Sequence, residues 1–292
     1  MDGKIMDALI GAVKDKMGAG YTVEAQEMEK DNGVERTAVA ITGPAGMVSS
    51  VVYIDGMEAD IRAGAIDIQD AAGWIVQVHQ DSGYDWVADT IQHMDKEYIL
   101  QNVICQMARR EKGMHRLRDM PHEDVLDLSV IYQVCLGGSG DMAVSIAATY
   151  PFCRTYGIEE GELGRCARRN TEERGFLTRS VASILAEATG IPETEEGPIP
   201  PLWVLCTQTG SYGASVLLYK EPFDRLAERY GSDLYVIPSS IHEVLVVPTR
   251  GLEPEDPRCM VACINASEVP EGEQLSDNIY RYSREDGSLS IA

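Results

Sequence analysis

The segment VLDLSVIYQVCL (125–136), the run Gly137-Gly138-Ser139-Gly140 and the segment MAVSIAA (142–148) decide the fold class. Two stretches rich in apolar and β-branched residues, joined by a glycine-serine turn, predict a β-hairpin. Residues 149–157 and GELGRCARRNTEE (161–173) follow and are typical of helix. The three parts together predict one strand-strand-helix unit.

Two later regions repeat this order of elements. Residues 202–208 (LWVLCTQ) and 212–219 (YGASVLLY) are predicted strands, and a helix opens after them at Pro222, since the first turn of a helix tolerates proline. Residues 234–238 and 242–248 are predicted strands before a helix over 255–266. Three such units predict an α+β fold, in which helices cover one face of antiparallel sheets.

The N-terminal region combines helical and strand periodicity. Ile5, Leu9 and Val13 have helical spacing, and the run 66–80 indicates a second helix. Between them, residues 21–30, 34–42 and 48–54 predict a three-stranded meander with Asn32-Gly33 as its first turn. Further on, periodicity does not decide whether residues 99–108 (ILQNVICQMA) are strand or buried helix.

These elements suggest three regions. An N-terminal region covers residues 1–97, an arginine-rich central region covers 98–190, and a C-terminal region covers 202–292. The segment 190–201 (GIPETEEGPIPP) has the proline and glutamate content of a stiff linker or a surface loop. The central and C-terminal regions are therefore either separate domains or parts of one.

Composition indicates a folded protein of a reducing compartment. The 292 residues are 44% hydrophobic, which exceeds the apolar content of a disordered chain. No stretch reaches the roughly 18 apolar residues of a bilayer span, and the N-terminus lacks the layout of a secretory signal. Seven cysteines, an odd number, fit free thiols. We therefore expect a cytoplasmic protein without a membrane segment.

The formal charge of −22 is unevenly distributed along the chain. Residues 1–100 hold 18 acidic and 7 basic side chains, residues 101–180 hold 11 of each, and residues 181–292 hold 18 and 7. Acidic flanks repel duplex nucleic acid and anionic membranes, and they favour a basic protein partner. The predicted partner is thus a protein that contacts these flanks.

Four segments carry a resemblance to a known family: PHEDVLDLSVIYQV (121–134), YGASVLLY (212–219), LYVIPSSIHEVLVVP (234–248) and LSDNIYRY (275–282). Together they resemble an uncharacterised bacterial family, one of the domain-of-unknown-function groups common in gut anaerobes and their mobile elements. The similarity runs from about the first hairpin to the C-terminus. It implies no catalytic or binding residue, because no active site is established for that family.

The segment Ser239-Ser240-Ile241-His242-Glu243 contains the residue types of a hydrolytic triad. If His242 lies in the following strand, Glu243 points to the opposite sheet face, and Ser240 lies roughly 7 Å away, too far for a nucleophile–base contact. The other interpretation is a structural turn whose hydroxyls bond the backbone. Ser240 and His242 are therefore candidate catalytic residues only if the chain turns tightly here.

Cys153 is a second candidate nucleophile. It precedes Arg154 near an expected helix start, a setting that lowers a thiol pKa, although buried inert cysteine is the commoner state. The same choice applies to Cys166. The histidines are dispersed, Cys259 and Cys263 lack further ligands, and no glycine-rich phosphate-binding motif is present. The sequence therefore predicts neither a metal nor a cofactor.

Basic residues cluster twice in the central region, as candidate contacts for an anion or a partner: Arg109, Arg110, Arg116, Arg118, Arg165, Arg168 and Arg169. The other interpretation is pairing within the helix over 161–173, of Glu162 with Arg165, Arg168 with Glu172, and Arg169 with Glu173.

The sequence as a whole favours an interaction or regulatory protein without catalytic activity. The alternatives are a hydrolase with a serine or cysteine nucleophile near His242, and an acidic mimic of nucleic acid that inhibits a basic partner.

Overall fold

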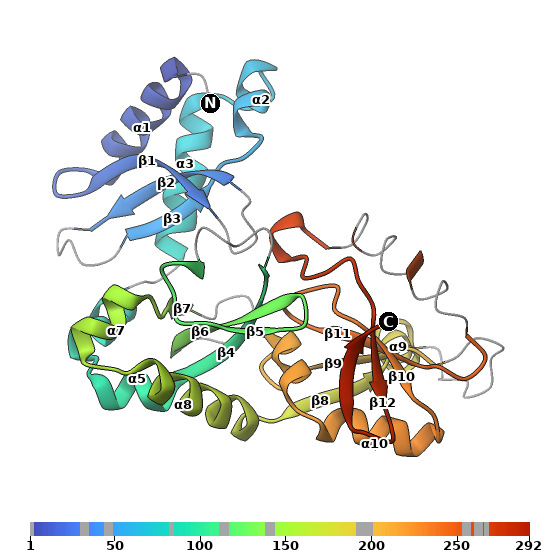
Figure 1. Cartoon of the computed structure of the whole chain (residues 1–292). Coiled ribbons are helices and arrows are strands. Elements are labelled where there is room, and N and C mark those ends of the chain that lie inside the picture. The colour runs from blue at the N-terminus through green and yellow to red at the C-terminus, as the bar shows by residue number, and fades with distance from the viewer. Residues whose placement is uncertain are drawn as a thin grey trace. The chain divides into compact units, whose positions relative to one another are not determined.

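The computed structural model describes residues 3–29, 35–43, 49–81, 85–110, 117–137, 144–190, 201–252, 258–259, 265 and 269–292. The chain forms two compact units, Met1–Met94 and Asp95–Ala292 (Figure 1). Both contain helices and antiparallel sheets, so the predicted α+β class is confirmed. Within the described ranges, no helix combines the length and the apolar content that a bilayer span requires.

The first unit contains the predicted helix, meander and second helix, with two short helices in addition. Its elements are α1 (Gly3–Met17), β1 (Thr22–Glu29), β2 (Glu35–Thr42), β3 (Ser49–Tyr53), α2 (Met57–Arg62), α3 (Ile68–Asp81) and α4 (Asp85–His93). β2 pairs antiparallel with both β1 and β3. The Asn32-Gly33 turn lies outside the described residues.

Helices α1 and α3 cover one face of this three-stranded sheet. Val39 and Ile41 alternate along β2 and pack against Leu9 of α1 and Ile75 of α3, all four fully buried. The period of two in the strand and of about 3.6 in the helices brings these apolar residues together. This packing gives the first unit a hydrophobic core of its own.

The second unit begins with a four-stranded sheet. Its elements are α5 (Lys96–Asn102), β4 (Val103–Arg109), β5 (Glu123–Val125), β6 (Leu128–Gly137), β7 (Val144–Ala147), α7 (Tyr150–Tyr156) and α8 (Glu160–Glu173). β6 pairs with β4 on one side and with β5 and β7 on the other. The predicted hairpin of β6 and β7 is confirmed, although Gly138, Ser139 and Gly140 lie outside the described residues.

The undecided segment 99–108 contains both kinds of structure. Asp95 caps α5 by accepting a hydrogen bond from the Tyr98 N–H at 2.8 Å, the usual role of aspartate at a helix start. The helix ends at Asn102, and β4 starts at Val103. One apolar run therefore serves a helix end and a buried strand, which explains why its periodicity was ambiguous.

A six-stranded antiparallel sheet of order β13-β12-β10-β11-β9-β8 completes the second unit. The elements in chain order are β8 (Phe176–Ser180), α9 (Val181–Thr189), β9 (Trp203–Thr207), η2 (Gly213–Leu218), α10 (Glu221–Tyr230), β10 (Leu234–Ile237), β11 (Val244–Pro248), η3 (Glu271–Glu273), β12 (Tyr280–Ser283) and β13 (Ser288–Ile291). The predicted pair of strands before and after Pro238 corresponds to β10 and β11. Most of the predicted helix over 255–266 and of the predicted linker over 190–201 lies outside the described residues.

The strand predicted at 212–219 is wrong. Tyr212 has φ +53°, in the left-handed region, and the chain continues as the 3-10 helix η2. A Cβ on Gly213 would lie 2.0 Å from the carbonyl oxygen of His242 and 2.7 Å from Cys206 Cβ. This approach of two backbones redirects the chain, and η2 then buries Ala214, Val216 and Leu217 against the sheet. Residues 213–217 are buried as the apolar content of the segment predicts, but the segment does not have the two-residue period of a strand.

Candidate functional site

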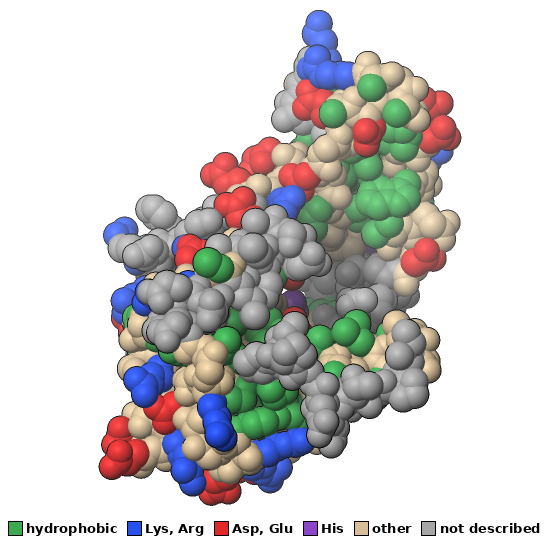
Figure 2. Space-filling model, turned by 90° about the vertical axis from the view of Figure 1, so that its right-hand side faces the viewer, with side chains coloured by type: hydrophobic (Ala, Val, Ile, Leu, Met, Phe, Trp, Pro, Cys, Tyr) green, Lys and Arg blue, Asp and Glu red, His purple; other side chains and the backbone are tan. Residues whose placement is uncertain are grey.

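Two tryptophans of the first unit are exposed to solvent. Trp74 is 48% exposed on α3, and Trp86 is 38% exposed on α4. The buried residues of α3, from Ala71 to Val76, lie on a different face of the helix. Figure 2 shows hydrophobic side chains gathered on one face of this unit, with Asp and Glu side chains and fewer Lys or Arg side chains around them. Exposed tryptophan suits a contact surface, because Trp is enriched among the residues that dominate binding energy.

The helices that carry these tryptophans are acidic. Between Arg62 and Lys96 the sequence contains aspartates but no lysine or arginine. Asp70 lies one turn before Trp74 on α3, and Asp89 lies one turn after Trp86 on α4, so each aspartate shares a helix face with a tryptophan. The two helices therefore combine exposed apolar side chains with aspartates, and neither helix carries a lysine or an arginine.

A serine–histidine contact lies inside the same unit. The Ser50 hydroxyl on β3 is 2.6 Å from Nδ1 of His79 on α3. Ser50 is 6% exposed, and the ring of Tyr21 meets the imidazole edge-on at 5.9 Å between centroids. The contact joins the sheet to the helix layer, and its geometry is also that of a nucleophile and a base.

In the second unit, the segment 239–243 forms a turn, and β11 begins only at Val244. The Ser240 hydroxyl accepts a hydrogen bond from the backbone N–H of His242 at 2.9 Å, as serine does in structural turns. His242 Nε2 lies 4.0 Å from the carboxylate of Glu273. The adjacent Glu243 is therefore not the carboxylate nearest to this imidazole, and the one that is comes from η3, which the sequence could not indicate.

Tyr212 brings further polar groups to this turn. Its ring stacks on His242 at 6.2 Å and 17° between planes, and its hydroxyl lies 2.9 Å from that of Ser145 on β7. Behind Ser145, Gln133 donates to Gln106 at 2.7 Å within the buried sheet. These contacts connect the two sheets of the second unit, so they account for the left-handed backbone at Tyr212 through packing.

Cys153 lies on α7 and is only 5% exposed. Burial raises the pKa of this thiol, and the negative charge of Glu160 raises it further. Cys105 on β4 is fully buried, and its pKa rises to about 11. A raised thiol pKa depletes the reactive thiolate at neutral pH. Cys166 on α8 is half-buried.

The arginines of the central region pair with carboxylates from other elements. Arg109 contacts Asp277 at 2.5 Å, Arg110 contacts Asp124 at 3.4 Å, and Arg168 contacts Glu123 at 2.6 Å. The predicted helical pair of Arg169 and Glu173 is present at 3.9 Å, whereas Arg168 pairs across the sheet rather than with Glu172. Arg118 and Arg165 are exposed, and Arg116 lies outside the described residues.

Glu123 is the centre of one such network. It accepts hydrogen bonds from Arg168 at 2.6 Å and from the Tyr132 hydroxyl at 2.8 Å. The bond from Arg168 lowers the pKa of Glu123 despite partial burial, and the bond from Tyr132 lowers it further. Gly164 on α8 makes room for this arrangement, because a Cβ there would lie 2.9 Å from the Tyr132 hydroxyl.

Asp127 is the centre of a second network, in the turn between β5 and β6. It accepts hydrogen bonds from Tyr280 at 2.5 Å, Ser276 at 2.6 Å and Asn278 at 3.0 Å. Burial acts to raise the pKa of Asp127, but these hydrogen bonds outweigh it, so the pKa is lowered. One carboxylate thereby holds the C-terminal strand region to the four-stranded sheet.

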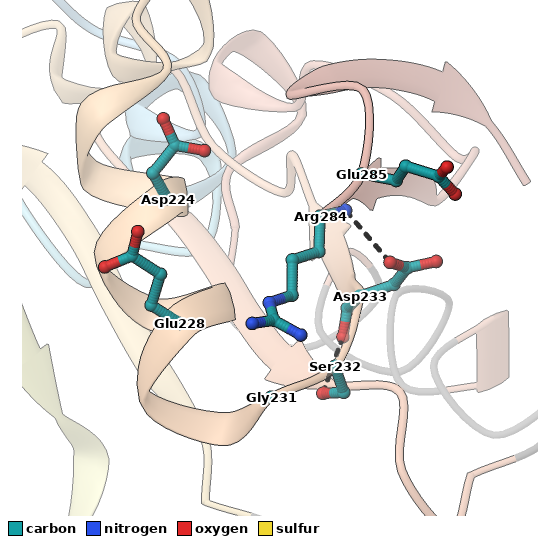
Figure 3. Close-up of a pocket in the computed structure, with 7 residues that line it drawn as sticks. All are labelled: Asp224, Glu228, Gly231, Ser232, Asp233, Arg284 and Glu285. Atoms are coloured by element: carbon teal, nitrogen blue, oxygen red, sulfur yellow. Dashed lines mark hydrogen bonds between the residues drawn. The ribbon is translucent and has the colours of Figure 1, made fainter.

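A pocket of about 520 Å³ lies between α10 and the turn of the β12–β13 hairpin. The Arg281 side chain donates twice to Asp233, at 2.6 and 2.9 Å. The backbone N–H of Arg284 donates to the same carboxylate at 2.9 Å. Figure 3 shows the Arg284 side chain extending into the pocket from the hairpin, opposite Asp224 and Glu228 of α10. The Tyr282 hydroxyl donates to Asp224 at 2.5 Å. The pocket carboxylates thus hold the hairpin to α10 and β10.

Metal ligands do not cluster in the described part of the chain: it contains no group of three or more His, Cys, Asp or Glu side chains able to hold an ion.

A family model described as a family of unknown function (DUF5688) matches residues 4–284. The chain belongs to this family. The resemblance to an uncharacterised family is thereby confirmed. Comparison of this chain with the curated proteins and with the solved structures found no match.

Sequence reasoning missed the main surface features of this DUF5688 chain. The helix that contains Trp74 was predicted from its buried apolar residues, which do not include Trp74. Trp86 lies on a helix that was not predicted. Lysine and arginine are absent between Arg62 and Lys96, but they are also absent between Arg118 and Arg154, so this signal alone does not single out the tryptophans. Ser50 and His79 had no such signal, because their contact depends on how a strand and a helix pack.

Proposed function

We propose that this chain is an interaction protein without catalytic activity of its own, and that its first unit contacts a protein partner through Trp74 and Trp86. The observation that carries the proposal is the exposure of Trp74, 48%, on a helix whose other face is buried. Large exposed apolar side chains mark interaction sites, and tryptophan contributes most when a partner covers it.

The candidate catalytic groups of the second unit support the same conclusion. The Ser240 hydroxyl bonds the backbone of its own turn, so a nucleophile–base contact with His242 would require that bond to change. The Cys153 thiol is buried and has a raised pKa. Neither residue has the activated setting that nucleophilic catalysis requires.

Site-specific cross-linking tests the proposal. A photoreactive phenylalanine derivative replaces Trp74 or Trp86 in the full chain, and in a control it replaces Leu185, which is 56% exposed on α9 of the second unit. We expect discrete protein adducts from positions 74 and 86 in cells that express the chain, and none from position 185. Adducts from position 185 alone, or from no position, would overturn the proposal.

A hydrolase is the second candidate function, and the contact of Ser50 with His79 at 2.6 Å favours it. In this chemistry His79 accepts the hydroxyl proton while Ser50 Oγ forms a bond to an ester carbonyl. The ester C–O bond then breaks and the leaving alcohol takes up the proton, after which water cleaves the acyl-serine to release the acid and restore the Ser50 hydroxyl. A fluorophosphonate probe tests it. Labelling that is lost in Ser50→Ala and retained in Ser49→Ala would establish the activity, because Ser49 bonds the Thr42 hydroxyl instead. Absence of labelling in the wild type would exclude this serine nucleophile.

We further propose that the protein acts in the cytoplasm of bacteria, where a regulatory partner would meet it. The six cysteines that the structure describes are free thiols, which suits a reducing compartment. Fractionation of cells that carry the native gene tests the location, and enrichment in a secreted fraction would contradict it.

A further inference from the structure

We infer that the partner presents a segment rich in lysine and arginine, and that its cations contact the tryptophans and aspartates of α3 and α4. This inference rests on the proposed function, because it names the chemistry of the partner at the same surface. Two independent features support it: the exposed indole rings, and the sign of the charge around them.

The charge around the tryptophans is of one sign. Residues 63–94 contain aspartates at positions 67, 70, 81, 85 and 89, and no lysine or arginine. Exposed carboxylates on helices that carry no lysine or arginine attract a cationic partner and repel nucleic acid and anionic membranes.

Helix geometry places these carboxylates beside the indole rings. Asp70 precedes Trp74 by four residues, and Asp81 follows it by seven, so all three lie along one side of α3. Among the described residues, neither aspartate has an ion pair with lysine or arginine within 4.0 Å. Asp81 accepts a hydrogen bond from Gln77 at 2.7 Å. On α4, Asp89 follows Trp86 by three residues, lies 3.4 Å from Nδ1 of His93 and is 76% exposed.

Indole and carboxylate together recognise a cation better than either does alone. A guanidinium or ammonium group stacks over the face of tryptophan, which is the strongest aromatic partner for a cation. A neighbouring carboxylate then bonds the same cation. A purely apolar partner would leave the aspartates unpaired as they lose water, which disfavours it.

Calorimetry with defined peptides tests the inference on the full chain. The probe is a short peptide of alternating arginine and leucine, and its control has glutamine in place of each arginine. We expect the arginine peptide to bind and the glutamine peptide not to bind. We also expect the affinity to fall at least about tenfold between about 50 mM and about 500 mM salt, because screening weakens exposed charge pairs.

Two triple variants with the same change in net charge locate the contact. Asp70→Asn, Asp81→Asn and Asp89→Asn together should weaken binding about tenfold. The matched control is Asp7→Asn, Asp15→Asn and Asp60→Asn, which removes exposed charges from α1 and α2 of the same unit. It should change the affinity less than about twofold.

Equal weakening by both triple variants would overturn the inference, because the binding would then reflect net charge alone. Binding of the glutamine peptide with equal affinity, or binding that does not depend on salt, would also overturn it. In that case adducts from positions 74 and 86 would still support the proposed function. Absence of those adducts would instead refute the proposed function, whichever peptide binds.

Discussion

The hydrogen-bonded carboxylates of the second unit and the aspartates of the tryptophan helices in the first unit have different surroundings. In the second unit, Glu123, Asp127 and Asp233 accept hydrogen bonds from arginines and hydroxyls of the same chain. In the first unit, the aspartates of α3 and α4 lie beside Trp74 and Trp86, with no lysine or arginine nearby in the sequence. These carboxylates of the second unit thus hold its elements together, whereas aspartates on α3 and α4 are exposed on the first unit.

The net charge of the chain therefore does not show which charged side chains are available to a partner. The arginine-rich centre looked like a contact site for an anion, yet Arg109, Arg110 and Arg168 all pair with carboxylates of the second unit. Exposed pairs of this kind add little stability each, but pairs within hydrogen-bond networks fix the arrangement of elements. The carboxylates that contact these arginines are therefore engaged within the chain, unlike the exposed aspartates of α3 and α4.

Among the substitutions, Gly213→Ala should lower the free energy of unfolding most, because Gly213 lies where two segments of the second unit pack closely. The added Cβ would lie 2.0 Å from a backbone oxygen, so the two chain segments must separate. We expect a loss of about 3 kcal/mol in the free energy of unfolding, measured by urea titration with the buried Trp203 as reporter. Gly11→Ala on α1 is the matched control: nothing lies within 4 Å of its Cβ, and it should be neutral or stabilising.

Asp127→Ala should have a slightly smaller effect. It removes the acceptor of three hydrogen bonds and leaves partly buried donors without a partner. We expect a loss of about 2 kcal/mol, again followed through Trp203. Asp286→Ala on the exposed β12–β13 turn serves as the comparison. Equal losses from the two variants would show that the Asp127 network does not hold the second unit together.

Trp74→Ala should separate binding from stability in the first unit. Because the side chain is half exposed, the free energy of unfolding should change by less than about 1 kcal/mol, while affinity for the partner falls at least about tenfold. Calorimetry and urea titration measure the two quantities. A large loss of stability without a loss of affinity would place Trp74 in the structure of the unit rather than in its contact surface.

The stability of the second unit should also depend on acid pH. The pKa values of Glu123 and Asp127 are lowered in the folded chain, so their contribution is present above the unfolded values near pH 4 and is lost as the pH falls through the folded values. Urea midpoints from pH 6 to pH 3 should therefore fall less steeply for Asp127→Asn than for the wild type. Parallel profiles would contradict the role given to this carboxylate.

Ser50→Ala should have the smallest effect. If the contact with His79 is structural, its loss should cost about 1 kcal/mol and leave partner binding unchanged. Urea titration and calorimetry give both values. A change in affinity without a change in stability would connect this pair to the function of the first unit.

Local sequence patterns predicted much of the fold. The meander was recognisable from strand periodicity around Asn32-Gly33, and α3 and α8 from their helical spacing. The 3-10 helix at 213–218 was missed because a close backbone approach at Gly213, not its residue propensities, sets its path. The short strands β12 and β13 have too few residues to establish a period.

The candidate site was less predictable than the fold. Ser240 and His242 are only two residues apart in sequence, yet the carboxylate near His242 comes from residue 273. Similarly, Arg168 pairs with residue 123 rather than within its own helix. Such contacts depend on tertiary packing, which a single sequence does not reveal. Composition does show an acidic stretch around Trp74, but it does not show that this side chain is exposed.

Oxidative footprinting of the full chain tests the central claim most directly. Hydroxyl radicals modify exposed side chains, so the oxidation of Trp74 and Trp86 is compared with that of Leu185 and Ile291, which are exposed in the second unit. On addition of saturating arginine-leucine peptide, we predict strong protection of both tryptophans and unchanged oxidation of the two control residues. Protection of Leu185 or Ile291 with no change at the tryptophans would contradict the account.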